Sequence, residues 1–364
     1  MRSSGILMHI TSLPGPYGVG TMGKEAYRFV DFLEEAGQNY WQILPLTPTG
    51  YGDSPYQSCS TYAGNHYLID LDMLVEQGLL RTEEITGCNW GANPNWADFG
   101  LLYTHRLNVL RLAYGRFTEN AALEAFAREN SNWLPDFALF MALKTQKNGK
   151  PWYEWEESLK RREPAAIWQA RQELKEEIWF YTFVQYLFHC QWEQLRTYAH
   201  ENGISIIGDV PIYVPYDSAD VWSNPEWFLL DETLTPSDVA GCPPDGFNED
   251  GQLWGNPLYR WDLHKKDNYS WWIQRLRGAA ARYDVIRVDH FRGFAGFYAV
   301  PFGAENARNG KWMTGPGLDF MEAVKNALPD TPMIAEDLGF LTEDVRQLRD
   351  DSGFPGMKVL EFAF

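Results

Sequence analysis

Six short apolar segments, separated in several places by helical patterns, place the tightest limit on the fold of this chain. They lie at residues 5–10, 40–46, 204–210, 285–288, 333–335 and 357–362, and most of them end in Gly, Pro, Asp or Glu. Their apolarity is continuous rather than alternating, which is typical of parallel strands buried on both faces. Helical patterns occupy residues 24–36, 165–200, 269–283, 318–328 and 342–349. This alternation predicts an α/β fold with a parallel sheet.

The distances between these segments are uneven. The stretch between residues 46 and 204 is too long for one crossover, and its helical patterns predict an inserted helical subdomain over 66–165. The stretch at 214–262 is rich in Pro, Gly, Asn and Trp and predicts an inserted loop subdomain beside the site. The length of 364 residues suits a single barrel domain, 1–364, that carries such insertions.

Composition excludes several classes of partner. The net charge of −18 would repel nucleic acid and anionic membranes but not a neutral sugar. We find neither a signal peptide nor an apolar run of membrane-spanning length. The four cysteines and seven histidines form no metal-binding pattern, and no nucleotide-binding loop occurs. We therefore expect a cytoplasmic protein without metal or cofactor. The 16 Trp and 19 Tyr belong mostly to a core, but those in polar loops suit sugar binding.

Three carboxylates stand at or near the ends of successive predicted strands, namely Asp209, Asp289 and Glu336. Two carboxylates at neighbouring strand ends are the minimum equipment for cleaving a glycosidic bond. Side chains alternate along a strand, so Arg287 and Asp289 share a face, and the guanidinium favours an ionised nucleophile. A structural Arg–Asp ion pair explains the same pattern equally well. Likewise, Asp209 before a proline is typical of an ordinary turn.

Several longer motifs occur together in one order. They are SGILMHITSLP, PTGYGDSPYQS, GDVPIYV, PPDGFNEDGQLWGNPLYRW, RVDHFRG and IAEDLG. With these motifs the chain resembles the 4-α-glucanotransferases of the amylomaltase or disproportionating-enzyme type, glycoside hydrolase family 77, from Ser3 to Phe364. The resemblance implies a TIM (β/α)8 barrel of the α-amylase clan. It also implies retaining transfer of an α-1,4-glucan segment, from maltooligosaccharides, amylose or glycogen-derived dextrins, to the 4-hydroxyl of an acceptor glucose or glucan.

The resemblance assigns roles to residues that match the family motifs. It implies Asp289 as the nucleophile, Glu336 as the acid/base and Arg287 as the partner that orients and ionises Asp289. The residues that it implies for substrate contacts are Asp209, Tyr51, Ser54, Tyr56, Asp245, Trp254, Asn256 and His290.

The sequence departs from the family at its C-terminal end. Family members carry a third carboxylate in a His-Asp-Asn type motif after the seventh strand, and this sequence contains no such motif. The chain stops near the sixth strand, so we expect a C-terminally truncated form whose barrel lacks its last strands. Two alternatives to a glucanotransferase stay open: an α-amylase-like hydrolase, and a catalytically impaired glucan-binding fragment with an open sheet edge.

Overall fold

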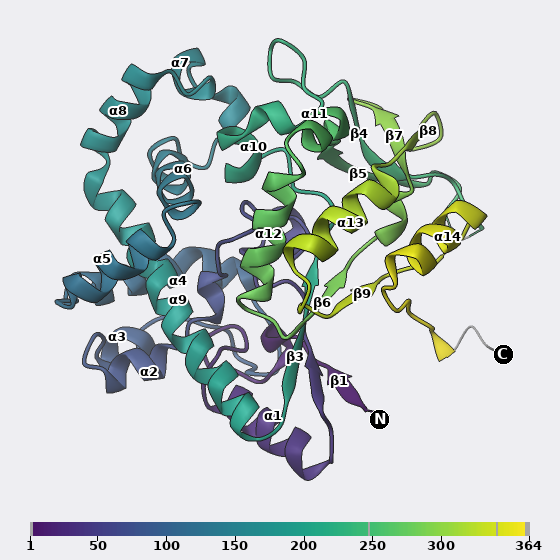
Figure 1. Ribbon diagram of the computed structural model, residues 1–364. Helices are drawn as coiled ribbons and strands as arrows, with labels where there is room; N and C mark the ends of the chain where they lie inside the picture. The colour runs from purple at the N-terminus through teal and green to yellow at the C-terminus, as the bar shows by residue number, and fades with distance from the viewer. Residues whose placement is uncertain (1–2, 247, 340, 361–364) are drawn as a thin grey trace. The chain divides into compact units, whose positions relative to one another are not determined.

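The computed structural model describes residues 3–246, 248–339 and 341–360 (Figure 1). They separate into two compact units, Met1–Pro55 with Tyr62–Ile206, and Tyr56–Thr61 with Ile207–Phe364. The predicted division into a barrel with insertions at 66–165 and 214–262 stays a prediction. In the described part of the chain, no helix combines the length and apolarity needed to cross a bilayer. Nor does a cluster of three or more potential metal ligands occur among the described residues.

The first unit begins with a parallel strand pair. Strand β1 (Gly5–Leu7) pairs with β2 (Tyr40–Gln42), and helix α1 (Lys24–Glu35) connects them. Helix α1 buries Ala26, Val30 and Leu33, whose spacing places them on one face. Gly5 permits the strand contact, because a Cβ there would lie 2.5 Å from the carbonyl oxygen of Tyr40.

Helices form most of the first unit, and α9 is the longest of them (Figure 1). The α-helices are α2 (Leu71–Glu76), α3 (Thr82–Thr86), α4 (Phe99–Tyr114), α5 (Asn120–Glu129), α6 (Leu134–Gln146), α7 (Glu157–Lys160), α8 (Pro164–Glu173) and α9 (Lys175–Glu201). The 3-10 helices are η1 (Ile10–Ser12), η2 (Tyr51–Asp53), η3 (His66–Leu68) and η4 (Trp152–Glu154). Helix α9 packs against α4, α5 and α6. The helical pattern predicted over 165–200 is confirmed as α8 and α9, which are separated only at Leu174.

The second unit contains the parallel strands that follow. Strand β3 (Ser205–Val210) starts in the first unit and ends in the second, where it pairs with β6 (Val285–Val288), and β6 pairs with β9 (Met333–Ala335). Helices α12 (Ser270–Ala280) and α13 (Gly317–Ala327) precede β6 and β9, as the predicted alternation requires. The other helices of this unit are α10 (Ala219–Ser223), η5 (Pro225–Trp227), α11 (Trp261–Lys266), η6 (Phe291–Phe294) and α14 (Glu343–Ser352).

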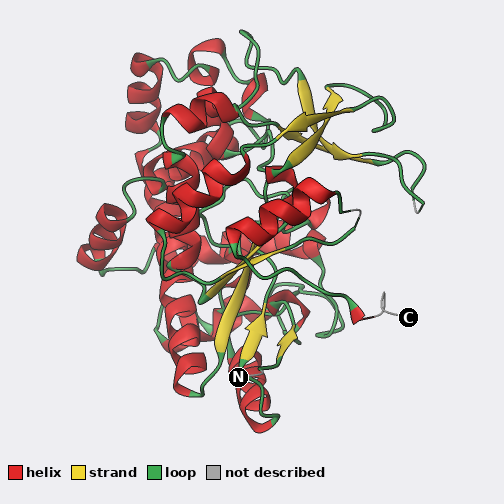
Figure 2. Ribbon diagram, turned by 45° about the vertical axis from the view of Figure 1, so that its right-hand side comes forward, coloured by secondary structure: helices red, strands yellow, loops and turns green. Residues whose placement is uncertain are grey.

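A second sheet was not predicted. Strands β5 (Gln252–Pro257), β4 (Asp238–Cys242), β7 (Gly296–Pro301) and β8 (Lys311–Thr314) form an antiparallel sheet in that order (Figure 2). Two of these strands lie in the stretch that the sequence indicated to be loop. Each of the two is short and contains a Gly, and β4 pairs with β7, much later in the chain, as well as with nearby β5, so local patterns do not indicate the sheet.

The sixth predicted strand, 357–362, is absent as far as the structure describes it. Residues 357–360 form no strand, and only a single parallel bridge between Ala335 and Gly356 marks the position next to β9. Residues 361 and 362 lie outside the described residues. Among the described residues, the Met357 N–H does not bond to the backbone of a neighbouring strand. It donates a hydrogen bond to the Asp337 carboxylate at 2.7 Å.

Candidate active site

Three neighbouring strands bring the predicted carboxylates to one edge of the second unit's parallel sheet. Asp209 lies opposite Arg287 in the β3–β6 register, and Val288 lies opposite Ala335 in the β6–β9 register. The ladder continues past the strand ends. The Asp289 N–H donates to the carbonyl of Val210, and the Glu336 N–H donates to that of Val288, both at 3.0 Å. The backbone therefore fixes Asp289 and Glu336 at adjacent positions of the sheet edge.

Arg287 bridges two of these carboxylates. Its Nη1 donates to Asp289 Oδ1 at 2.9 Å, the contact that the alternation of side chains predicts, and to Asp209 Oδ1 at 2.7 Å. Burial alone would lower the pKa of Arg287, but the charges of Asp209 and Asp289 outweigh it and raise the pKa above its usual range. The guanidinium therefore stays charged and holds one oxygen of Asp289 in place.

Asp209 is nearly fully buried, with 3% of its surface exposed. Besides the Arg287 guanidinium, it accepts a hydrogen bond from Tyr56 Oη at 2.7 Å. Burial raises the pKa of Asp209 to about 6, against the lowering effect of Arg287 and Tyr56, and the charge of Asp289 adds to the rise. Asp209 is thus a buried anchor that determines where Arg287 and Tyr56 lie.

Glu336 has the environment of a general acid. Burial raises the pKa of its carboxyl above the usual range, and the nearby charge of Asp289 raises it further. Two backbone N–H groups, from His290 at 2.8 Å and from Leu338 at 2.9 Å, donate to its oxygens and partly oppose this rise. The His290 backbone adopts a left-handed conformation with φ of 51°, which is uncommon for a residue other than glycine. The strained turn after β6 therefore supplies one of the two groups that orient Glu336.

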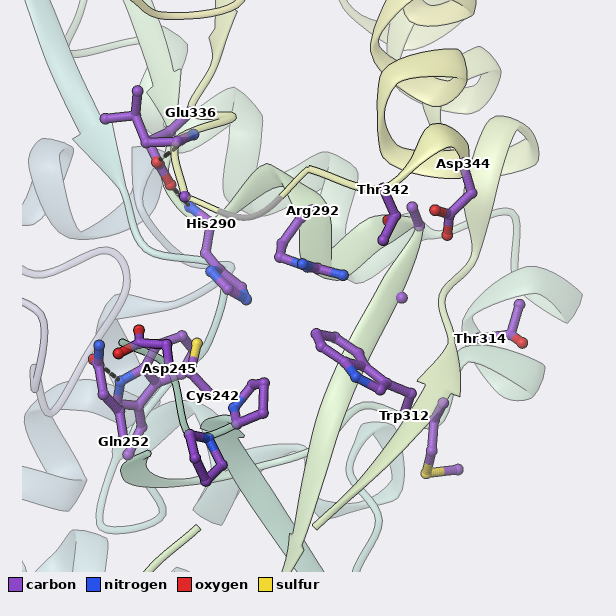
Figure 3. A pocket seen from close by; sticks show the side chains of 18 of the residues that line it. Cys242, Asp245, Gln252, His290, Arg292, Trp312, Thr314, Glu336, Thr342 and Asp344 are labelled. Carbon is purple, nitrogen blue, oxygen red and sulfur yellow. Dashed lines mark hydrogen bonds between the residues drawn. The ribbon is translucent and has the colours of Figure 1, made fainter. Parts of the chain in front are cut away.

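Two cavities meet at Trp254 and His290, whose rings pack edge to face with centroids 4.8 Å apart. Asp289 lines the smaller, of about 230 Å³, together with Tyr56 and Asn256. Glu336 lines the larger, of about 1070 Å³, together with Asp245 (Figure 3). Burial lowers the pKa of His290 to about 4, and the charge of Arg292 adds to this, so the shared imidazole is neutral near pH 7.

Most of the predicted site residues therefore belong to the second unit. The exceptions are Tyr51 and Ser54, which belong to the first unit, and their roles stay predictions. Sequence reasoning missed Gln57, whose Nε2 donates to Asn256 Oδ1 at 3.3 Å and to the Trp254 carbonyl at 3.5 Å. Gln57 directly follows Tyr56 in the same motif, and this position could have indicated that Gln57 belongs to the site.

The larger cavity also contains two residues that were not predicted to take part. Arg292 and Trp312 both line it, and the guanidinium carbon of Arg292 lies 4.1 Å from the centroid of the Trp312 ring. Arg292 belongs to the same motif as Asp289, but Trp312 lies on β8, in the sheet that local patterns do not indicate.

Removing the Tyr56 hydroxyl should change how activity depends on pH. That hydroxyl favours the ionised form of Asp209, so Tyr56→Phe should raise the pKa of Asp209 above its value of about 6. If catalysis requires ionised Asp209, kcat/KM falls as the pH falls through this pKa, and the acid limb of the profile should move to higher pH in the variant. The measurement is kcat/KM for maltotriose between pH 4 and 9.

Tyr198→Phe is the matched control for Tyr56→Phe. The Tyr198 hydroxyl also donates to an aspartate, Asp31, at 2.6 Å, but in the first unit. Its pH profile should equal that of the unaltered protein. An acid limb that stays in place in Tyr56→Phe would show that Asp209 does not control it.

Comparison with known proteins finds relatives that match nearly the whole chain. The sequence profile of the family described as 4-alpha-glucanotransferase, glycoside hydrolase family 77, matches residues 8–364. The 4-alpha-glucanotransferase of Aquifex aeolicus is 49% identical over 100% of this chain and 74% of its own length. That of Clostridium butyricum is 48% identical over 98% of this chain and 74% of its own length.

Solved structures show the same likeness. Amylomaltase from Streptococcus agalactiae in complex with acarbose superposes with a TM-score of 0.97 at 46% identity, over 100% of this chain and 74% of that one. Amylomaltase from Corynebacterium glutamicum has a TM-score of 0.77 at 20% identity, over 97% of this chain and 50% of that one, which is a likeness of fold. The predicted α/β fold is therefore confirmed as that of the amylomaltases.

Proposed function

The chain belongs to the 4-alpha-glucanotransferases of glycoside hydrolase family 77, and on this premise we propose that Asp289 is its catalytic nucleophile and Glu336 its acid and base. The activity is transfer of α-1,4-glucan segments, and neither hydrolysis nor simple glucan binding is favoured. The observation that carries the proposal is the contrast between two carboxylates on adjacent strand ends. Asp289 is paired with a guanidinium, whereas burial raises the pKa of Glu336.

The proposed reaction proceeds in two displacements. In the first, an oxygen of Asp289 attacks the anomeric carbon, the glycosidic bond breaks, and Glu336 gives its proton to the leaving 4-oxygen. The Oδ1 atom of Asp289 is held by Arg287, which leaves Oδ2 for the attack. In the second, ionised Glu336 removes the proton from an incoming 4-hydroxyl, which displaces Asp289 and forms the new glycosidic bond.

The placement of the two carboxylates supports a retaining outcome. Neighbouring strands lie about 4.8 Å apart, which is close to the roughly 5–5.5 Å between carboxyl groups in retaining enzymes. An inverting enzyme needs a wider gap, roughly 6.5–9.5 Å, to admit water between the sugar and its base. Adjacent strand ends favour the shorter of these two separations.

We propose α-1,4-glucans as the substrates, namely maltooligosaccharides, amylose and glycogen-derived dextrins. The related amylomaltase from Streptococcus agalactiae was solved with acarbose, and the net charge of −18 does not repel a neutral glucan. Trp254, half-buried where the two cavities meet, suits the apolar face of a sugar ring. We also propose that the enzyme acts in the cytoplasm, which the small number and wide spacing of its four cysteines support.

A trapped intermediate tests the proposed nucleophile directly. With a 5-fluoro-α-glucosyl fluoride donor, the first displacement should outrun the second, so that a glucosyl ester accumulates. Mass spectrometry of protease digests should place the added mass on Asp289. Labelling of Glu336 or Asp209 instead would overturn the assignment. Chromatography of the products from maltotriose tests the reaction type, because transfer yields glucose together with longer oligomers.

A further inference from the structure

The larger cavity extends well beyond the reacting groups. Its volume of about 1070 Å³ lies at or above the upper end of the range for small-molecule sites, so it has room for several sugar rings. Glu336 lines it, but Asp289 does not. Because the acid and base acts on the leaving and incoming 4-oxygens, this cavity is the side on which the acceptor lies. This assignment rests on the proposed function.

An aromatic platform stands in this cavity on the antiparallel sheet. Trp312 of β8 keeps 48% of its surface exposed. The Arg292 guanidinium covers its ring at 4.1 Å, and the Tyr298 ring meets it edge on with centroids 5.3 Å apart. Figure 3 shows Arg292 beside the Trp312 ring, with Glu336 and His290 on one side and Asp344 on the other.

The support of this platform depends on the sheet. Tyr298 of β7 lies directly opposite Trp312 in the β7–β8 register. Gly310 admits the tyrosine, because a Cβ there would lie 2.3 Å from the Tyr298 ring. Both Arg292 and Tyr298 therefore hold the indole in one orientation, although nearly half of its surface faces no protein atom. A rigid, partly exposed aromatic ring beside guanidinium N–H donors matches a sugar's apolar face and hydroxyls.

We propose that Trp312, positioned by Arg292 and Tyr298, is a stacking platform for acceptor sugars beyond the first, and that it makes the enzyme prefer oligosaccharide acceptors over glucose. The first acceptor ring must reach Glu336 with its 4-hydroxyl. Trp312 lies away from the turn that holds Glu336, on β8, so it contacts only acceptors longer than one ring. Its contribution is to acceptor binding, and the two displacements do not depend on it.

The experiment isolates the acceptor side with α-maltosyl fluoride as donor, since fluoride leaves no sugar in the cavity. Initial rates of transfer to labelled glucose and to labelled maltotriose give KM for each acceptor. Trp312→Ala should raise KM for maltotriose about three- to tenfold, as expected for one aromatic contact, and leave KM for glucose and both kcat values unchanged. Trp312→Phe keeps a smaller ring, so its KM for maltotriose should lie between that of the unaltered protein and that of Trp312→Ala.

Trp168→Ala is the matched control, because this tryptophan is also exposed, at 67%, but lies on α8 of the first unit. It should change neither KM. The proposal would be overturned if Trp312→Ala changed KM equally for both acceptors, or changed neither KM. If Trp312→Ala does not fold, the same result in Trp312→Phe would overturn it. A wrong assignment of Asp289 as the nucleophile would give a different result, because an Asp289→Asn variant would then still consume the fluoride donor.

Discussion

Asp289→Asn should lower kcat/KM for maltotriose disproportionation by on the order of 10⁴-fold or more, the scale seen when a covalent nucleophile is removed. The amide still fills the space beside Arg287, at the end of β6. It cannot form a stable glucosyl ester, so neither displacement takes place. Because the change removes a step and not a binding contact, the loss should appear in kcat.

The same variant should also fail with α-glucosyl fluoride. This donor needs no proton on its leaving group, so its consumption depends on the nucleophile alone. Asp284→Asn is the matched control: the same chemical change next to the other end of β6, which should leave kcat within about twofold, the usual scale away from functional groups. Turnover of either donor by Asp289→Asn near the unaltered rate would refute Asp289 as the nucleophile.

Glu336→Gln should lower kcat for maltotriose by about 10²–10⁴-fold, the usual contribution of a general acid or base. The amide keeps an oxygen that can accept the N–H groups of His290 and Leu338, so the site should retain its geometry and its affinity for glucans. It can neither protonate the leaving 4-oxygen nor deprotonate the acceptor. The measurement is kcat and KM with maltotriose, beside glucan affinity by calorimetry.

The fluoride donor distinguishes the role of Glu336 from that of Asp289. In Glu336→Gln, α-glucosyl fluoride should release a burst of about one equivalent of fluoride and then stall, because the first displacement needs no acid and the second needs the base. Glu343→Gln, on the exposed start of α14, is the control and should behave as the unaltered protein does. A Glu336→Gln enzyme that disproportionates maltotriose at the normal rate would exclude Glu336 as the acid and base.

Much of the site could be predicted from the sequence because its groups are tied to strand ends. The segments before Asp209, Asp289 and Glu336 are short, apolar and continuous, and parallel strands present their carboxyl ends at one edge of the sheet. The shared face of Arg287 and Asp289 also follows from local alternation along β6. Such features depend on neighbours in sequence, so a single sequence carries them.

Other parts could not be predicted, since they depend on pairing across long distances in the chain. The β5–β4–β7–β8 sheet joins residues from Asp238 to Thr314, and the sequence without this sheet does not indicate that Trp312 lines the same cavity as Glu336. The segment 357–360 has a strand-like composition but forms no strand where the structure describes it. At that position the Asp337 side chain takes the backbone hydrogen bond of Met357.

By itself the sequence determined the α/β class, the family and the strand-end carboxylates, because apolar periodicity and contiguous motifs are local properties of the chain. Only the tertiary structure decided how those carboxylates differ. Burial raises the pKa of Glu336, and Arg287 bridges Asp209 as well as Asp289, through contacts among three strands far apart in sequence. Desolvation and charge pairing depend on what surrounds a group in space, so these properties follow from the packing of the strands and not from their residues alone.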